Sequence, residues 1–125
     1  MAATSVLAAV LLAQSAFSLG LDTGPSEQTD VGYDELANGN PAAAIEKIES
    51  SGALEEKDPA ALINLGNAYA RLGRMNEALR YYRAAVETDT RYDLELADGS
   101  WMDSRQAARL ALIALKRRTE NAINE

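Results

Sequence analysis

The residues that could do chemistry in this chain are mostly carboxylates. They cluster in one stretch, at Glu46, Glu49, Glu55, Glu56 and Asp58. The chain has no histidine and no cysteine, which excludes Ser-His-Asp and Cys-His triads, thiol redox chemistry and the usual structural zinc sites. A calcium loop needs alternating acids around a central glycine, and neither this stretch nor "DLELADG" at 93–99 has that spacing. We therefore expect solvated surface acids, no metal and no other cofactor.

Composition favours a small helical protein. The chain has 125 residues, enough for one small domain, and 47% of them are hydrophobic, enough for a core. Only 6% are aromatic while alanine is plentiful, which favours closely packed helices over a sheet sandwich. The net charge of −7 argues against a partner that is a nucleic acid or an anionic lipid surface.

The N-terminal residues indicate export. The apolar run Val6–Ala13 is too short to span a bilayer but has the length of a signal-peptide core. "AFS" at 16–18 resembles a signal-peptidase site, which makes 1–18 a signal peptide and 19–29 a flexible lead-in. The mature chain would be periplasmic or secreted, with no stable membrane insertion. No basic residue precedes the run, so an irregular helix of a cytosolic chain and a true start further upstream are alternatives.

The elements that must position these residues repeat along the chain. When the sequence is shifted by 34 residues, six pairs of similar type coincide. The pairs are Val31 and Leu65, Gly32 and Gly66, Gly39 and Gly73, Ala44 and Ala78, Ile45 and Leu79, and Ile48 and Tyr82.

Two helices are predicted at 59–72 and 75–88. Asp58 and Pro59 form an N-terminal cap signal, and Gly73 ends the first helix. Each helix has one apolar stripe, made of Leu62, Leu65, Gly66, Tyr69 and Leu72 in the first and of Ala78, Leu79, Tyr82, Ala85 and Val86 in the second. We expect Gly66 and Ala78 to face each other where the helices cross.

This pattern resembles the tetratricopeptide repeat family, in its bacterial exported type, whose unit is a 34-residue helix–turn–helix. The residues that carry the resemblance lie in 59–92 and are Leu62, Leu65, Gly66, Tyr69, Ala78, Tyr82 and Ala85. Thr90 stands where the family has proline. Residues 30–58 match as a degenerate repeat, because Glu35 replaces an aromatic and Gly52 shortens the second helix. The resemblance implies an all-α stack of about two repeats that binds proteins.

The repeat pattern stops after Tyr92. Residues 93–103 alternate in polarity around Asp98-Gly99, which predicts a short β-hairpin or an ordered loop. A C-terminal capping helix is predicted over 104–121. We expect Trp101 to be buried against it. Leu110 and Ile113 lie on its outer side, where either Trp101 covers them or they form a contact patch for another chain.

The resemblance also places a binding face. In such stacks the first helix of each pair lines the concave side, which here presents Ala60, Ile63, Asn64, Asn67, Ala70 and Arg71. Asparagine and arginine can bind a peptide backbone or a carboxylate. Some family members clamp a C-terminal carboxylate with several basic residues, but Arg71 is the only basic candidate, so that activity is not carried over.

The sequence therefore predicts an exported, non-catalytic module for protein–protein interaction or assembly. Its partner would be a protein or a peptide, and a homo-oligomer is possible. The alternatives are a self-assembling envelope subunit and a carboxylate-based enzyme on a helical scaffold.

Overall fold

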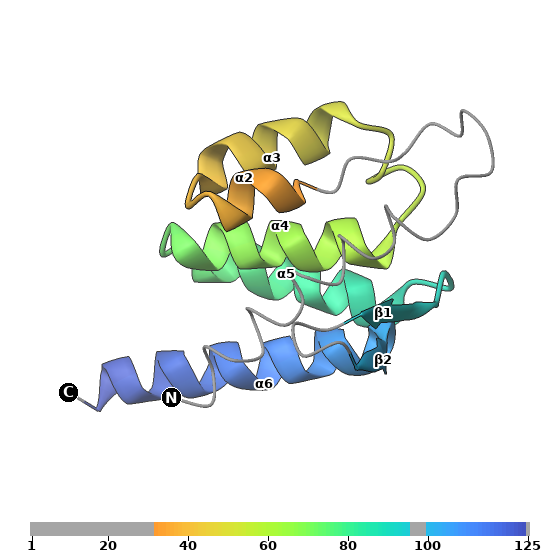
Figure 1. Cartoon of the computed structure of the whole chain (residues 1–125). Coiled ribbons are helices and arrows are strands. Elements are labelled where there is room, and N and C mark those ends of the chain that lie inside the picture. Colours follow the sequence, from red (N-terminus) through yellow and green to blue (C-terminus); the bar gives the residue numbers. More distant parts are fainter. Residues whose placement is uncertain (1–31, 96–99, 125) are drawn as a thin grey trace, which may run out of the picture.

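The computed structural model describes residues 32–95 and 100–124, which form a stack of helices in three layers (Figure 1). The elements, in chain order, are α2 (Tyr33–Ala37), α3 (Pro41–Ser50), α4 (Pro59–Arg71), α5 (Met75–Glu87), β1 (Asp93–Glu95), β2 (Trp101–Asp103) and α6 (Ser104–Ile123). The predicted signal peptide at 1–18 and lead-in at 19–29 lie outside the described residues.

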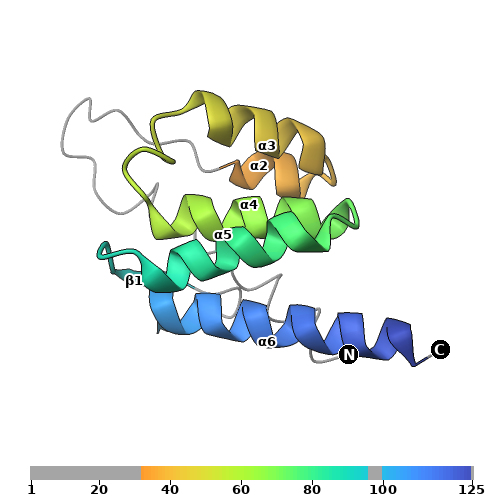
Figure 2. The ribbon, with the colours of Figure 1, turned by 180° about the vertical axis from the view of Figure 1, so that it is seen from behind.

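The layers follow the order of the chain. The pair of α2 and α3 forms one outer layer, α4 and α5 form the middle, and α6 with the β-hairpin forms the other outer layer, in both Figure 1 and the reverse view of Figure 2. In the part of the chain that the structure describes, no helix has both the length and the apolar character needed to cross a membrane. The all-α repeat stack with a hairpin and a final helix is confirmed.

Side-chain caps start three of the helices. The carboxylate of Asp58 accepts a hydrogen bond from the backbone N–H of Ala61 at 3.1 Å, and the Oδ1 atoms of Asn40 and Asp103 do the same for α3 and α6 at 3.2 and 3.1 Å. Each cap satisfies one of the N–H groups that a helix start leaves without a partner. The predicted cap at Asp58 is confirmed.

The two repeats share one helix-pair design. Gly39 after α2 and Gly73 after α4 both have φ of +77°, the left-handed conformation that ends a helix. A Cβ atom on Gly66 would lie 2.3 Å from the ring of Tyr82, and a Cβ on Gly32 would lie 2.9 Å from the side chain of Ile48. The same close approach of glycine to a side chain on the second helix thus recurs 34 residues apart.

The crossing of α4 and α5 differs from the prediction in one partner. The side chain nearest to Gly66 is the ring of Tyr82 and not Ala78. Tyr82 is fully buried, and its hydroxyl donates to Asn67 Oδ1 at 2.6 Å. Gly66 is therefore small because a whole aromatic ring occupies the space in front of it.

Tyr69 joins α4 to both α5 and α3. The rings of Tyr69 and Tyr81 stack at 5.5 Å between centroids and 7° between planes. The guanidinium groups of Arg74 and Arg80 lie 5.1 and 5.5 Å from the Tyr69 and Tyr81 rings, respectively. Tyr69 also donates its hydroxyl to Glu49 Oε1 at 3.1 Å.

The first repeat departs from the second in the way that its sequence suggested. α2 has only five residues, and Glu35, at the position of the missing aromatic, pairs with Lys47 at 2.8 Å. α3 ends at Ser50, two residues before Gly52. An ion pair thus stands between α2 and α3 where the second repeat uses stacked rings.

The β-hairpin is confirmed. β1 and β2 pair antiparallel, with Leu94 opposite Met102 and Glu95 opposite Trp101. Tyr92 anchors the hairpin, because its C=O accepts from Ser104 N–H at 2.9 Å and its hydroxyl donates to the carboxylate of Asp58. This contact ties the start of α4 to the start of α6.

The predicted burial of Trp101 is wrong. Its exposed fraction is 60%, and that of Ile113 is 47%. Neighbouring residues of a strand point to opposite faces, and Met102 takes the inward position against the core, so Trp101 points outward. Trp101 is thus not the buried cover that one of the two alternatives placed over Leu110 and Ile113, and Leu110 is half-buried.

The contact between Gly66 and Tyr82 can be tested with a double-mutant cycle. Alanine favours a helix interior over glycine by about 1 kcal/mol, yet Gly66→Ala should lower the free energy of unfolding by about 1–3 kcal/mol because its Cβ meets the ring. In a Tyr82→Leu background the same change should cost less. Urea unfolding of the four proteins measures both values, and equal costs in the two backgrounds would contradict the contact.

Alkaline unfolding tests the two buried phenols. Burial raises the pKa of Tyr82, and burial followed by the charge of Asp58 raises the pKa of Tyr92. The folded chain therefore keeps protons that the unfolded chain releases, so this stability is complete below the unfolded pKa of about 10 and falls above it. Tyr82→Phe and Tyr92→Phe should each flatten that fall by up to about 1.4 kcal/mol per pH unit. Urea unfolding from about pH 9 to about pH 11.5 measures the slope, and a slope unchanged in both variants would refute the assignment.

Candidate functional site

The six residues predicted to bind a partner lie on one stripe of α4. Their spacing repeats every three or four residues, which places them on the same side of a helix. Five of them are buried, with exposed fractions of 3% or less, and only Arg71 is exposed; the buried five are Ala60, Ile63, Asn64, Asn67 and Ala70. The structure thus places most of the stripe inside the fold, and its role in binding stays a prediction.

The position of α4 explains this burial. α4 lies in the middle layer, between the α2–α3 layer and α6, and packs against α5 beside it (Figures 1 and 2). Its stripe of Leu62, Leu65 and Tyr69 is buried as well, so the helix is enclosed on opposite sides. The sequence carried a signal for this, because Asn64, Asn67 and Arg71 are the only polar residues in Pro59–Arg71, and a helix that is apolar all round is a buried helix.

Asn67 is a polar group of the stripe with an unmet hydrogen bond. Its Oδ1 accepts from the Tyr82 hydroxyl at 2.6 Å, but its Nδ2 is buried and has no partner among the described residues. A buried donor without an acceptor costs about 1–3 kcal/mol. The carboxamide is thus oriented by Tyr82 and leaves two N–H groups available to an acceptor.

Arg71 forms a hydrogen bond within the fold. Its Nη1 donates to the C=O of Leu36 at 2.6 Å, near the end of α2. A cation suits the C-terminal end of a helix, where backbone carbonyls lack partners. Arg71 therefore links the two repeats while its side chain stays at the surface end of the stripe.

Two members of the acidic cluster accept hydrogen bonds within the fold. Glu49 accepts from Tyr69, and Asp58 both caps α4 and accepts from Tyr92. Elsewhere, the guanidinium of Arg91 holds the pKa of Asp103 below its usual range. No group of three or more acids in 32–95 and 100–124 is arranged to hold a metal ion.

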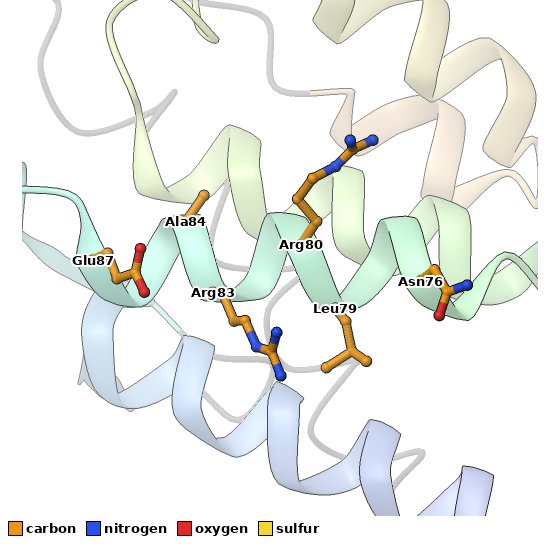
Figure 3. Close-up of a pocket in the computed structure, with 6 residues that line it drawn as sticks. All are labelled: Asn76, Leu79, Arg80, Arg83, Ala84 and Glu87. Carbon is orange, nitrogen blue, oxygen red and sulfur yellow. The ribbon is translucent and has the colours of Figure 1, made fainter.

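The outer side of α5 carries two depressions that the sequence reasoning missed. The first, of about 530 Å³, is lined by Asn76, Leu79, Arg80, Arg83, Ala84 and Glu87, all from α5 (Figure 3). Arg83 and Leu79 point toward α6, while Arg80 points toward the other neighbouring helices. The second, of about 500 Å³, shares Arg80, Ala84 and Glu87 and adds Leu54, Lys57, Leu62, Tyr81 and Thr88. Opposite charges line both, so neither favours an ion of one sign.

Comparison with known proteins agrees with the helix pair at the centre of the fold. A model of the tetratricopeptide repeat family matches residues 59–91, which begin at the first residue of α4 and include all of α5. Comparisons with curated proteins and with solved structures gave no significant match. The matched residues include Gly66, Tyr69 and Tyr82, whose contacts form the crossing described above. Residues 59–91 are therefore similar to one tetratricopeptide repeat unit, built from α4 and α5.

Proposed function

We propose that this protein is a non-catalytic module that binds a protein partner along the α4 stripe. Tetratricopeptide repeats generally mediate binding of protein partners. The observation that carries the proposal is the buried Nδ2 of Asn67, which has no acceptor among the described residues. An extended peptide offers a backbone carbonyl at every residue and would satisfy this donor.

The rest of the stripe supports the same kind of ligand. Ala60 and Ala70 have small side chains that allow a peptide backbone to come close to the helix. Ile63 offers an apolar contact between them, and Arg71 lies exposed at the end of the stripe. Five of the six residues are buried, so the partner must displace the parts of the fold that cover them. Only the free energy of its contacts in excess of that cost appears as affinity.

Photo-crosslinking in the native cell tests this proposal. A photoreactive phenylalanine analogue replaces Arg71 in one variant and Arg83 in a matched control. Both positions are exposed, but Arg83 lies on the outer side of α5. We expect a discrete adduct with another protein from position 71 and none from position 83. Adducts of equal yield from both positions, or none from position 71, would reject the stripe as the binding site.

We also propose that the chain is exported and that residues 1–18 are removed. The proposal rests on the apolar run Val6–Ala13 and the small residues of "AFS" before Leu19. Intact-mass measurement of the protein from its native cells should show a new N-terminus near Leu19. Recovery of the chain from the cytosol with Met1 in place would contradict export.

A further inference from the structure

The outer face of α6 combines an apolar residue with several cations. Arg109, Ile113, Lys116 and Arg117 are all exposed, and their spacing places them on the side of the helix opposite its buried residues. Those buried residues, Ala107, Ala108, Ala111, Ala114 and Leu115, face the core. α6 is the last layer of the stack (Figure 1), so Ile113 has no helix packed over it in the described structure.

These cations are not used within the fold. In the described part of the chain, Arg109, Lys116 and Arg117 form no ion pair. α6 as a whole has five basic residues and one acidic residue, a net charge of +4, in a chain whose net charge is −7. One outer layer thus carries a large net positive charge.

The other end of the stack has the opposite charge. Residues 32–58, which hold α2 and α3, contain seven acidic and two basic residues, a net charge of −5. Asp34, Glu46, Glu55 and Glu56 are exposed and form no ion pair with a described residue. On α3 the outward stripe is formed by Ala42, Glu46, Glu49 and Ser50, in which two acids lie between two small side chains.

We propose that two copies of this chain associate head to tail, with the outer face of α6 of one copy docked on the α2–α3 end of the next. The two surfaces lie on opposite outer layers (Figures 1 and 2), so one copy cannot bring its own two surfaces together. In this contact Ile113 packs against the small residues Ala42 and Ser50. The flanking cations Arg109 and Lys116 face Glu46 and the neighbouring acids.

A second copy is the occupant that the charges favour. Nucleic acid and anionic lipid would be repelled by the −7 net charge of the whole chain, whereas a second copy presents an acidic surface to the cations of α6. Because each copy uses two different surfaces, the contact is heterologous and leaves a free surface at each end. Association therefore continues beyond a dimer, and it weakens with salt because the paired charges are exposed.

Two variants, each blocked at one end, test the proposal in the full-length chain. The first carries Arg109→Gln, Lys116→Gln and Arg117→Gln, and the second carries Glu46→Gln, Glu55→Gln and Glu56→Gln. All six residues are exposed, so circular dichroism should show an unchanged fold. The matched control is Arg80→Gln with Arg83→Gln, which removes exposed cations from α5.

Sedimentation equilibrium over a hundredfold concentration range gives the mass of each species. We expect the wild type and the control to grow beyond dimers at low salt and to return to monomers at high salt. Each blocked variant alone should stay monomeric, and an equimolar mixture of the two should stop at a 1:1 dimer, since only one complementary pair of ends remains.

Other outcomes would overturn the proposal. A wild-type dimer that does not grow, and that only the α6 variant abolishes, would mean a symmetric contact between two α6 helices. A wild type that is monomeric throughout, with α6 cations that instead bind vesicles containing phosphatidylglycerol, would mean a membrane surface. A monomer that binds neither would mean that the cations only solvate the helix. None of these results depends on the α4 stripe.

Discussion

The fold depends on the close approach of α4 and α5 around the ring of Tyr82. Gly66 permits this approach because it places no side chain in front of the ring. The ring in turn fills the space between the helices, and its hydroxyl finds an acceptor in Asn67. A buried hydroxyl without an acceptor would lose part of what the ring gains by burial, so Gly66, Tyr82 and Asn67 act as one unit.

The same contact determines where binding chemistry can lie. The hydrogen bond from Tyr82 occupies the Oδ1 of the Asn67 carboxamide and leaves its buried Nδ2 without an acceptor among the described residues. Because α4 is the middle helix of a small stack, its second face is enclosed as well. A polar group is thus held in an apolar setting, where a hydrogen bond to a ligand gains more than it would at the surface.

The outer layers carry the charges that the middle layer excludes. α4 is nearly free of charged residues, while the α2–α3 layer is acidic and α6 is basic. Within each repeat, acids near the helix pairs have specific partners, as Glu49 has Tyr69 and Asp58 has Tyr92. The charges left over gather at the two ends of the stack, and this separation follows from the layered order of the chain.

The sequence by itself determined the helix pair at 59–88, the cap at Asp58 and the stop at Gly73, because these depend on neighbouring residues and on a period that the chain displays. It also predicted the hairpin and the final helix. It could not give the partner of Gly66, the exposure of Trp101 or the burial of the α4 stripe. Each of these depends on which side of an element meets another layer. Met102 points inward, so Trp101 points outward. The central position of α4 encloses residues that helical spacing alone would place on an open face. Tertiary packing decides such questions because a helix has a defined set of faces before it folds against its neighbours, but only the neighbours select which of them are covered.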